Sequence, residues 1–211
     1  MPRSTLRAAA FAGALYLTAT TAPAASAEVY PPAHASKVGV STKRMNVQIG
    51  SRVTVAGRVR APGRVTVSLQ VRRGWHWATL DRVRIDVAGR YVLRDRVRRT
   101  MSTRARVRIS DGTTRALGRL NVYRYAYASW YGPGLYGNRL GCGGTLTAGS
   151  LGVAHKSLPC GAKITLRKGG HVVRVSVIDR GPYVAGREFD LTAATAQMLG
   201  FSGHGPIQVA D

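Results

Sequence analysis

Residues 175–192 read VSVIDRGPYVAGREFDLT, and this stretch decides how the C-terminal half of the chain folds. Its first residues alternate in the way that is typical of a β-strand. Gly181 and Pro182 then force a turn, so we expect the strand to end at Asp179. The turn would leave this carboxyl group at the rim of a sheet, where a ligand can reach it.

The sequence around this stretch predicts a small, mostly β domain with one helix. Thr192 is a plausible N-cap, and Gly200 is suited to end a helix that begins just after it. A Lys-Gly-Gly turn separates the two strands expected before Asp179. The expected elements are strands at 163–167, 172–178 and 207–209 and a helix at 193–199.

Four short motifs follow one another in the C-terminal half, at 128–134 (ASWYGPG), 154–161 (AHKSLPCG), 175–183 and 186–192. With this order and spacing of motifs, the chain resembles the rare lipoprotein A (RlpA) family. The members that it resembles are septal ring lytic transglycosylases. The resemblance implies a six-stranded double-psi β-barrel over residues 124–211. Expansins and a family of endoglucanases share that barrel, and their Phe-Asp-Leu motif looks like residues 189–191.

The resemblance also implies an activity, lytic transglycosylation of peptidoglycan glycan strands that lack stem peptides. One acid/base can serve this reaction, because a sugar hydroxyl attacks in place of water. By motif match, Asp179 is the first candidate and Asp190 the second. His155 would orient a carboxylate or the substrate. No cofactor or metal is expected.

The three catalytic candidates each have a structural alternative, and other residues of the same motifs are candidates for substrate binding. Asp179 is also suited to accept backbone N–H bonds in its turn, and Asp190 to stabilise the helix that follows. His155 is equally compatible with a hydrogen-bonded rim position. The substrate-binding candidates are Trp130, which could instead be core, and Tyr131, Tyr183 and Arg180.

One position departs from the family pattern. Many members carry Asn-Gly-Glu in the loop before the histidine, and Gly144 stands where that Glu would be. Two functions of different classes therefore remain open. The first is a secreted wall lytic transglycosylase, and the second is a non-catalytic, expansin-like module that binds and loosens wall glycan.

The chain has two cysteines, Cys142 and Cys160. Zinc would need two more ligands at finger-like spacing, and none is present. A nucleophilic cysteine with His155 as its base is the other alternative. A lone pair in an oxidising compartment favours a disulfide, which we expect here.

The N-terminus predicts export. Residues 1–27 carry two arginines, an apolar run and an Ala-Ser-Ala site, the order of a secretory signal peptide with cleavage after Ala27. No cysteine follows the cleavage site, so no lipid anchor is expected. The apolar run is too short for a resident membrane span.

Residues 28–123 predict an immunoglobulin-like β-sandwich, which gives a mainly β chain with two domains. Short alternating stretches with turn signals between them are typical of this class. The Gly-Arg-Tyr at 89–91 resembles a late-strand motif of immunoglobulin-like modules on bacterial wall proteins. The expected strands are 51–60, 64–72, 75–80, 82–86, 90–93, 104–109 and 118–123.

Positive charge concentrates in this N-terminal half. The whole chain has a formal net charge of +23, and residues 28–123 hold 21 basic but only 5 acidic residues. An ordinary solvated face mixes signs, so we expect this one to bind a polyanion, such as an anionic wall polymer. Trp75 and Trp77 are suited to stack on sugars, or to pack in a core. Because of export, nucleic acid is not the expected partner.

Overall fold

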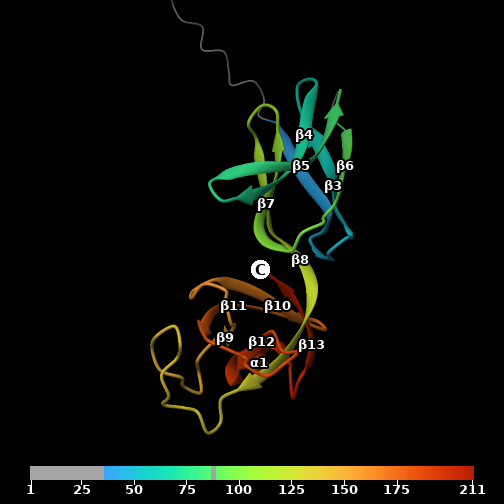
Figure 1. The fold of residues 1–211 in the computed structure, drawn as a ribbon. Helices are drawn as coiled ribbons and strands as arrows, with labels where there is room; N and C mark the ends of the chain where they lie inside the picture. The colour runs from blue at the N-terminus through green and yellow to red at the C-terminus, as the bar shows by residue number, and fades with distance from the viewer. Residues whose placement is uncertain (1–35, 87–88) are drawn as a thin grey trace, which may run out of the picture. The chain divides into compact units, whose positions relative to one another are not determined.

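The computed structural model describes residues 36–86 and 89–211 (Figure 1). The predicted signal peptide, residues 1–27 with cleavage after Ala27, lies outside the described residues. Within them the chain is mainly β, with thirteen strands and one short helix, which confirms the predicted fold class. None of the described helices is long and apolar enough to cross a membrane.

The N-terminal half consists of two sheets. One is antiparallel, with the order β1 (Lys37–Arg44), β3 (Arg52–Arg60) and β6 (Gly89–Arg96). The other has the order β5 (His76–Ile85), β4 (Val65–Arg73), β7 (Met101–Ile109) and the first part of β8 (Thr114–Tyr131). A short strand, β2 (Asn46–Gln48), pairs with β8 in parallel.

Strict alternation in these strands divides the side chains into a buried and an exposed set. In β3, the valines at 53, 55 and 59 are buried, whereas the arginines at 52, 58 and 60 are exposed. Residues of both sheets contribute to one hydrophobic core. The buried Tyr91 anchors β6 through its hydroxyl, which donates to the carbonyl oxygen of Gly39 at 2.9 Å. The assignment of this half to the immunoglobulin-like class stays a prediction.

Several strands are longer than expected, and two of them join stretches that the sequence divides. The stretches 75–80 and 82–86 form a single strand, β5, because Asp81 continues the pairing with Leu69. The division expected at residue 124 falls inside β8, which runs without a break from the N-terminal sheet into the C-terminal one. No loop separates the two halves there.

The C-terminal half is a closed barrel of six strands. Around the ring, β8 pairs with β13, β13 with β10, β10 with β11, β11 with β9, β9 with β12, and β12 again with β8. The new strands are β9 (Gly152–Ala154), β10 (Lys163–Lys168), β11 (His171–Asp179), β12 (Phe189–Thr192) and β13 (Gly205–Ala210). A second hydrophobic core fills this barrel.

The one described helix, α1 (Ala193–Leu199), has the ends that the sequence predicts. The Thr192 side chain accepts a hydrogen bond from the backbone N–H of Thr195, as an N-cap should. Gly200 adopts a left-handed conformation, with φ of 63°, and its N–H returns to the last turn. Because α1 follows β12 directly, its packing helps to hold that strand, and with it Asp190, in place.

Candidate active site

Two carboxyl groups meet where β9 lies between β11 and β12. Asp179 ends β11 and Asp190 lies in β12, and both pair in register with Ala154 of β9. Their side chains line one cavity of about 240 Å³. Other polar or aromatic residues of its wall are Tyr131, Arg180, Tyr183 and Arg187.

Backbone N–H groups hold the Asp179 side chain. Its Oδ1 accepts from Gly141 at 2.6 Å and from Arg180 at 2.8 Å. A Cβ atom at Gly141 would lie 2.8 Å from Cγ of Arg180 and 3.1 Å from its backbone nitrogen. Only glycine therefore allows this approach. The turn role predicted as an alternative for Asp179 is present, together with its position in the cavity wall.

Asp190 is half-buried in the wall of the same cavity. Burial raises the pKa of Asp190, and the nearby Asp179 carboxylate raises it further. A hydrogen bond of 2.9 Å from the Ser129 hydroxyl and the charge of Arg187 act in the opposite direction. A carboxyl group with a raised pKa keeps its proton at higher pH and is suited to act as a general acid.

Tyr131 places an unpaired hydroxyl beside these acids. Its oxygen is buried and has no hydrogen-bond partner among residues 36–86 and 89–211. Burial raises the pKa of Tyr131, and the carboxylates of Asp179 and then Asp190 raise it further. The phenol therefore stays protonated.

The two arginines of the cavity wall have different surroundings. The Arg180 guanidinium donates to the carbonyl oxygens of His155 and Leu158, at 3.1 and 2.7 Å, so it holds the loop after β9. Arg187 also lines the cavity, and its positive charge lowers the pKa of Asp190. Sequence reasoning named Arg180 for substrate binding and missed Arg187, although it stands in the quoted stretch.

The aromatic candidates differ in their position. Tyr183 lines the cavity and is 81% exposed, which leaves its ring free to contact a ligand. Trp130 is 38% exposed and is not part of this cavity wall. It lies between Ser129 and Tyr131 on β8, so alternation directs it to the opposite side of the strand.

His155 lies outside the cavity wall and faces a neighbouring ionic cluster. Its Nδ1 accepts the N–H groups of Ser157 and Leu158, at 3.1 and 3.0 Å, which assigns the proton of the neutral ring to Nε2. That Nε2 is 3.8 Å from Oε1 of Glu188, which binds Arg124 through both oxygens. Burial lowers the pKa of His155, against the opposing effect of Glu188. The carboxylate nearest its ring is thus neither of the two predicted acids.

The loop on the other side of Asp179 is cross-linked. Cys142 and Cys160 form the predicted disulfide, with their Cα atoms 5.5 Å apart. The N–H of Cys142 also donates to the carbonyl oxygen of Ile178, at 3.2 Å. Gly144, in the same loop, has a φ of 81° and its Cβ position is open. Among the described residues, no group of three or more His, Cys, Asp or Glu side chains is placed to hold a metal ion.

Comparison with known proteins gives matches to the barrel. A family model described as "Lytic transglycolase" matches residues 124–210. The "Probable endolytic peptidoglycan transglycosylase RlpA" of Synechocystis sp. is 41% identical over 85 residues, 39% of this chain and 26% of that protein. The protein of the same name from Aquifex aeolicus is 40% identical over 87 residues, 40% of this chain and 38% of that protein.

A further match has a similar extent. The "Endolytic peptidoglycan transglycosylase RlpA" of Campylobacter jejuni is 38% identical over 86 residues, 39% of this chain and 31% of that protein. The chain thus spans only about a quarter to two fifths of these relatives' length. A solved β-glucosidase from Listeria innocua aligns with 42% of this chain and 16% of its own, at a TM-score of 0.28 and 10% identity, which is too distant to support an argument.

The closed ring of six strands and the matched family model together support a double-psi β-barrel in the C-terminal half, similar to the class described as "Lytic transglycolase". Within that class, the identity of about 40% to three relatives makes the domain RlpA-like, as its four motifs predict.

Proposed function

We propose that this chain is an exported cell-wall protein whose barrel binds peptidoglycan glycan strands and cleaves them by non-hydrolytic lytic transglycosylation. One observation carries the proposal: Asp179 and Asp190 line the same cavity, and burial raises the pKa of Asp190. The names of the matched relatives support peptidoglycan as the substrate.

The proposed reaction needs one proton carrier and no water. The Asp190 carboxyl group donates its proton to the glycosidic oxygen while the bond from C1 to that oxygen breaks. The Asp179 carboxylate stabilises the positive charge that develops at C1. The 6-hydroxyl of the muramic acid then attacks C1 and returns its proton to Asp190, which leaves a 1,6-anhydro end. These roles reverse the ranking from the motifs, which put Asp179 first.

The remaining wall residues are assigned to binding and positioning. Tyr183 supplies an exposed ring for a sugar face, and Arg187 supplies a charge for carboxylate or hydroxyl groups. The Tyr131 hydroxyl donates to the substrate near C1. Arg180 and His155 act as positioning residues, since the Arg180 side chain binds the His155 carbonyl oxygen.

Digestion of amidase-treated, peptide-free peptidoglycan tests this function, with the soluble products analysed by mass spectrometry. We expect anhydro-saccharides from the wild type and at least about 100-fold less product from Asp190→Asn and Asp179→Asn. Asp86→Asn is the matched control, because that exposed carboxyl group lies in the N-terminal half and pairs with Arg64. Products with ordinary reducing ends would contradict transglycosylation.

A second function has one observation in its favour. Gly144 has no side chain where many family members carry a Glu, and its left-handed backbone disfavours one. Non-catalytic, expansin-like binding would then be the role of the barrel. That function predicts that the protein pellets with purified wall and releases no fragments. It also predicts that the Asp190→Asn variant binds the wall as well as the wild type does.

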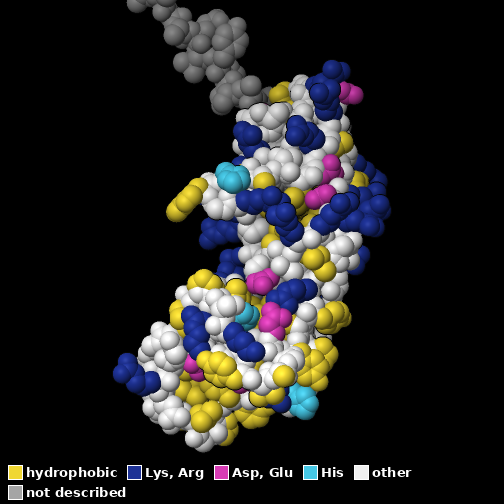
Figure 2. Space-filling view, viewed as in Figure 1, with side chains coloured by type: hydrophobic (Ala, Val, Ile, Leu, Met, Phe, Trp, Pro, Cys, Tyr) yellow, Lys and Arg dark blue, Asp and Glu magenta, His cyan; other side chains and the backbone are white. Residues whose placement is uncertain are grey.

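The excess of arginine in the N-terminal half supports a proposed second contact with the wall. We propose that this half holds the protein to anionic wall polymers, which concentrates the barrel on its substrate. On the face seen in Figure 2, positively charged side chains are spread widely over that half.

A further inference from the structure

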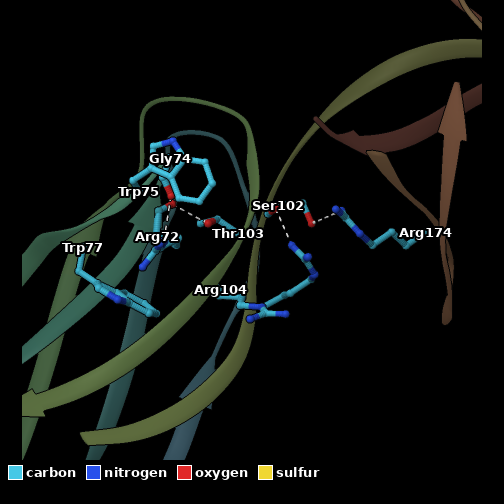
Figure 3. A pocket seen from close by; sticks show the side chains of 9 residues that line it. Arg72, Gly74, Trp75, Trp77, Ser102, Thr103, Arg104 and Arg174 are labelled. Atoms are coloured by element: carbon cyan, nitrogen blue, oxygen red, sulfur yellow. Dashed lines mark hydrogen bonds between the residues drawn. The ribbon is translucent and has the colours of Figure 1, made fainter. Parts of the chain in front are cut away.

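One face of the sheet formed by β5, β4, β7 and β8 carries a groove of arginines around a tryptophan. The groove is defined here by Arg72, Trp77, Arg104, Arg106 and Arg119. A cavity of about 560 Å³ lies on it and is lined by four of these five residues, all but Arg72. A second cavity adjoins it, contains Trp77, Arg104 and Arg119 as well, and extends to Arg72 and Trp75 (Figure 3).

The positive charges of the groove are not balanced from within. Arg104 of β7 lies directly opposite Arg119 of β8 in the pairing register. Like charges in this position repel and destabilise a sheet. Within residues 36–86 and 89–211, no carboxylate lies within ion-pair distance of any of the four groove arginines. An anion bound from outside would remove this repulsion.

Three of the four guanidinium groups are held in place by contacts on the sheet. Arg106 lies over the Trp77 ring, 4.0 Å from its centroid, and its Nε donates to Oε1 of Gln70 at 2.9 Å. Arg72 lies 5.7 Å from the same centroid. Arg119 donates to the carbonyl oxygen of Ser102 at 2.7 Å. Each arginine has five N–H donors, so most of them remain available for an anion.

Trp75 is the second, independent observation. It lies in the turn between β4 and β5, next to Gly74, and its side chain is 94% exposed. Its ring stands near Arg72 at the end of the groove (Figure 3). A tryptophan in this position adds nothing to the core. Exposed indole rings are typical surfaces for stacking on sugar rings or bases.

We propose that the arginine groove with Trp75 binds an anionic saccharide polymer, one whose repeating negative groups contact the arginines while a sugar ring stacks on Trp75. Phosphodiester and carboxylate groups both suit paired guanidinium donors. Single-stranded nucleic acid needs successive free aromatic faces, whereas Trp77 is covered by Arg106 and only Trp75 is free. The choice of a saccharide rests on the proposed function, but the groove itself does not.

Binding of the full chain to four probes tests the groove, with the dissociation constant measured by calorimetry at fixed ionic strength. The probes are phosphomannan, a saccharide polymer with phosphodiester groups, polygalacturonate, neutral dextran and a single-stranded oligonucleotide. We expect one or both anionic polymers without bases to bind, dextran not to bind, and the oligonucleotide to bind more weakly. The two anionic probes distinguish a phosphodiester from a carboxylate ligand. Binding of dextran, or tighter binding of the oligonucleotide, would overturn the proposal.

The decisive variants remove equal charge from two places. Arg104→Gln with Arg119→Gln should weaken binding at least about tenfold, as should Trp75→Ala. The matched control is Arg58→Gln with Arg90→Gln, because those two exposed arginines also face each other, across β3 and β6. We expect the control to change binding less than about twofold. Equal losses from both pairs would mean diffuse attraction and would overturn the groove.

The same measurement on Asp190→Asn separates this proposal from the proposed function. That variant should bind the anionic polymer as the wild type does, because Asp190 is a barrel residue outside both groove cavities. If the wild type releases no peptidoglycan fragments and the groove still binds, the barrel proposal fails alone. If fragments are released and neither anionic polymer binds, the groove proposal fails alone.

Discussion

The backbone N–H of Gly141 donates a hydrogen bond of 2.6 Å to Oδ1 of Asp179, across 38 positions of the chain. This bond ties the loop after β8 to the end of β11. Gly141 precedes Cys142, whose disulfide to Cys160 anchors the same loop on its other side. The position of the Asp179 carboxylate therefore depends on a glycine and on a cross-link, neither of which contacts the substrate in the proposed reaction.

Gly141→Ala should break this bond. The new Cβ atom would meet Cγ of Arg180 at 2.8 Å, so the loop has to move away from Asp179. We expect product release to fall about tenfold or more and the free energy of unfolding to fall by about 1–3 kcal/mol. Peptidoglycan digestion and urea denaturation measure the two effects. Gly149→Ala is the control, because its Cβ position is open; a loss of the same size there would contradict the explanation.

Ser129→Ala should change the pH dependence of the reaction. The Ser129 hydroxyl donates to the Asp190 carboxylate and lowers its pKa, so removing the hydroxyl raises that pKa. The acid then keeps its proton to higher pH. The alkaline limb of kcat/KM should therefore move to higher pH than in the wild type.

Ser176→Ala on β11 is the matched control for this shift. The Ser176 hydroxyl accepts a hydrogen bond from Lys163 and is not part of the cavity wall. Its pH profile should follow that of the wild type. An alkaline limb that stays in place in Ser129→Ala would show that Asp190 is not the group that titrates.

The disulfide should stabilise the barrel. Closing a loop of this length constrains the unfolded chain, so Cys142→Ser with Cys160→Ser should lower the free energy of unfolding by about 3 kcal/mol. Reductant should have the same effect on the wild type and none on the double variant. Denaturation curves with and without reductant provide the measurement. Coinciding curves for all four samples would contradict a stabilising role.

Local signals in the sequence predicted some elements well. The helix ends at Thr192 and Gly200 depend on the nearest few residues, and both are observed. The continuity of β5 through Asp81 was missed, because a β-bulge at Leu80 shifts the phase of the alternation in the middle of the strand. The three-residue β9 was missed as well, since it is too short to show a pattern.

The site was predicted to the extent that motifs name residues, and not in its geometry. Asp179 and Asp190 reach one cavity because both strands pair with β9, a long-range arrangement that no local pattern contains. The direction of the His155 ring depends on backbone N–H groups of the following loop. Arg187 was missed because an arginine in a basic chain has no distinguishing signal until its neighbours are known.

Tyr131→Phe should separate function from stability. The variant keeps the ring and removes a buried hydroxyl that has no partner among the described residues, so the free energy of unfolding should stay the same or rise by about 1 kcal/mol. Product release should fall about 10–100-fold, because the proposed donor to the substrate is lost. Thermal unfolding and product analysis by mass spectrometry measure the two effects.

Tyr91→Phe is the matched control, with the opposite expectation. The Tyr91 hydroxyl binds the carbonyl oxygen of Gly39 in the N-terminal core, so its removal should cost about 1 kcal/mol of stability and leave product release unchanged. The two variants make the same chemical change in two buried surroundings. A Tyr131→Phe protein that is less stable but fully active would assign this hydroxyl to folding and remove it from the proposed site.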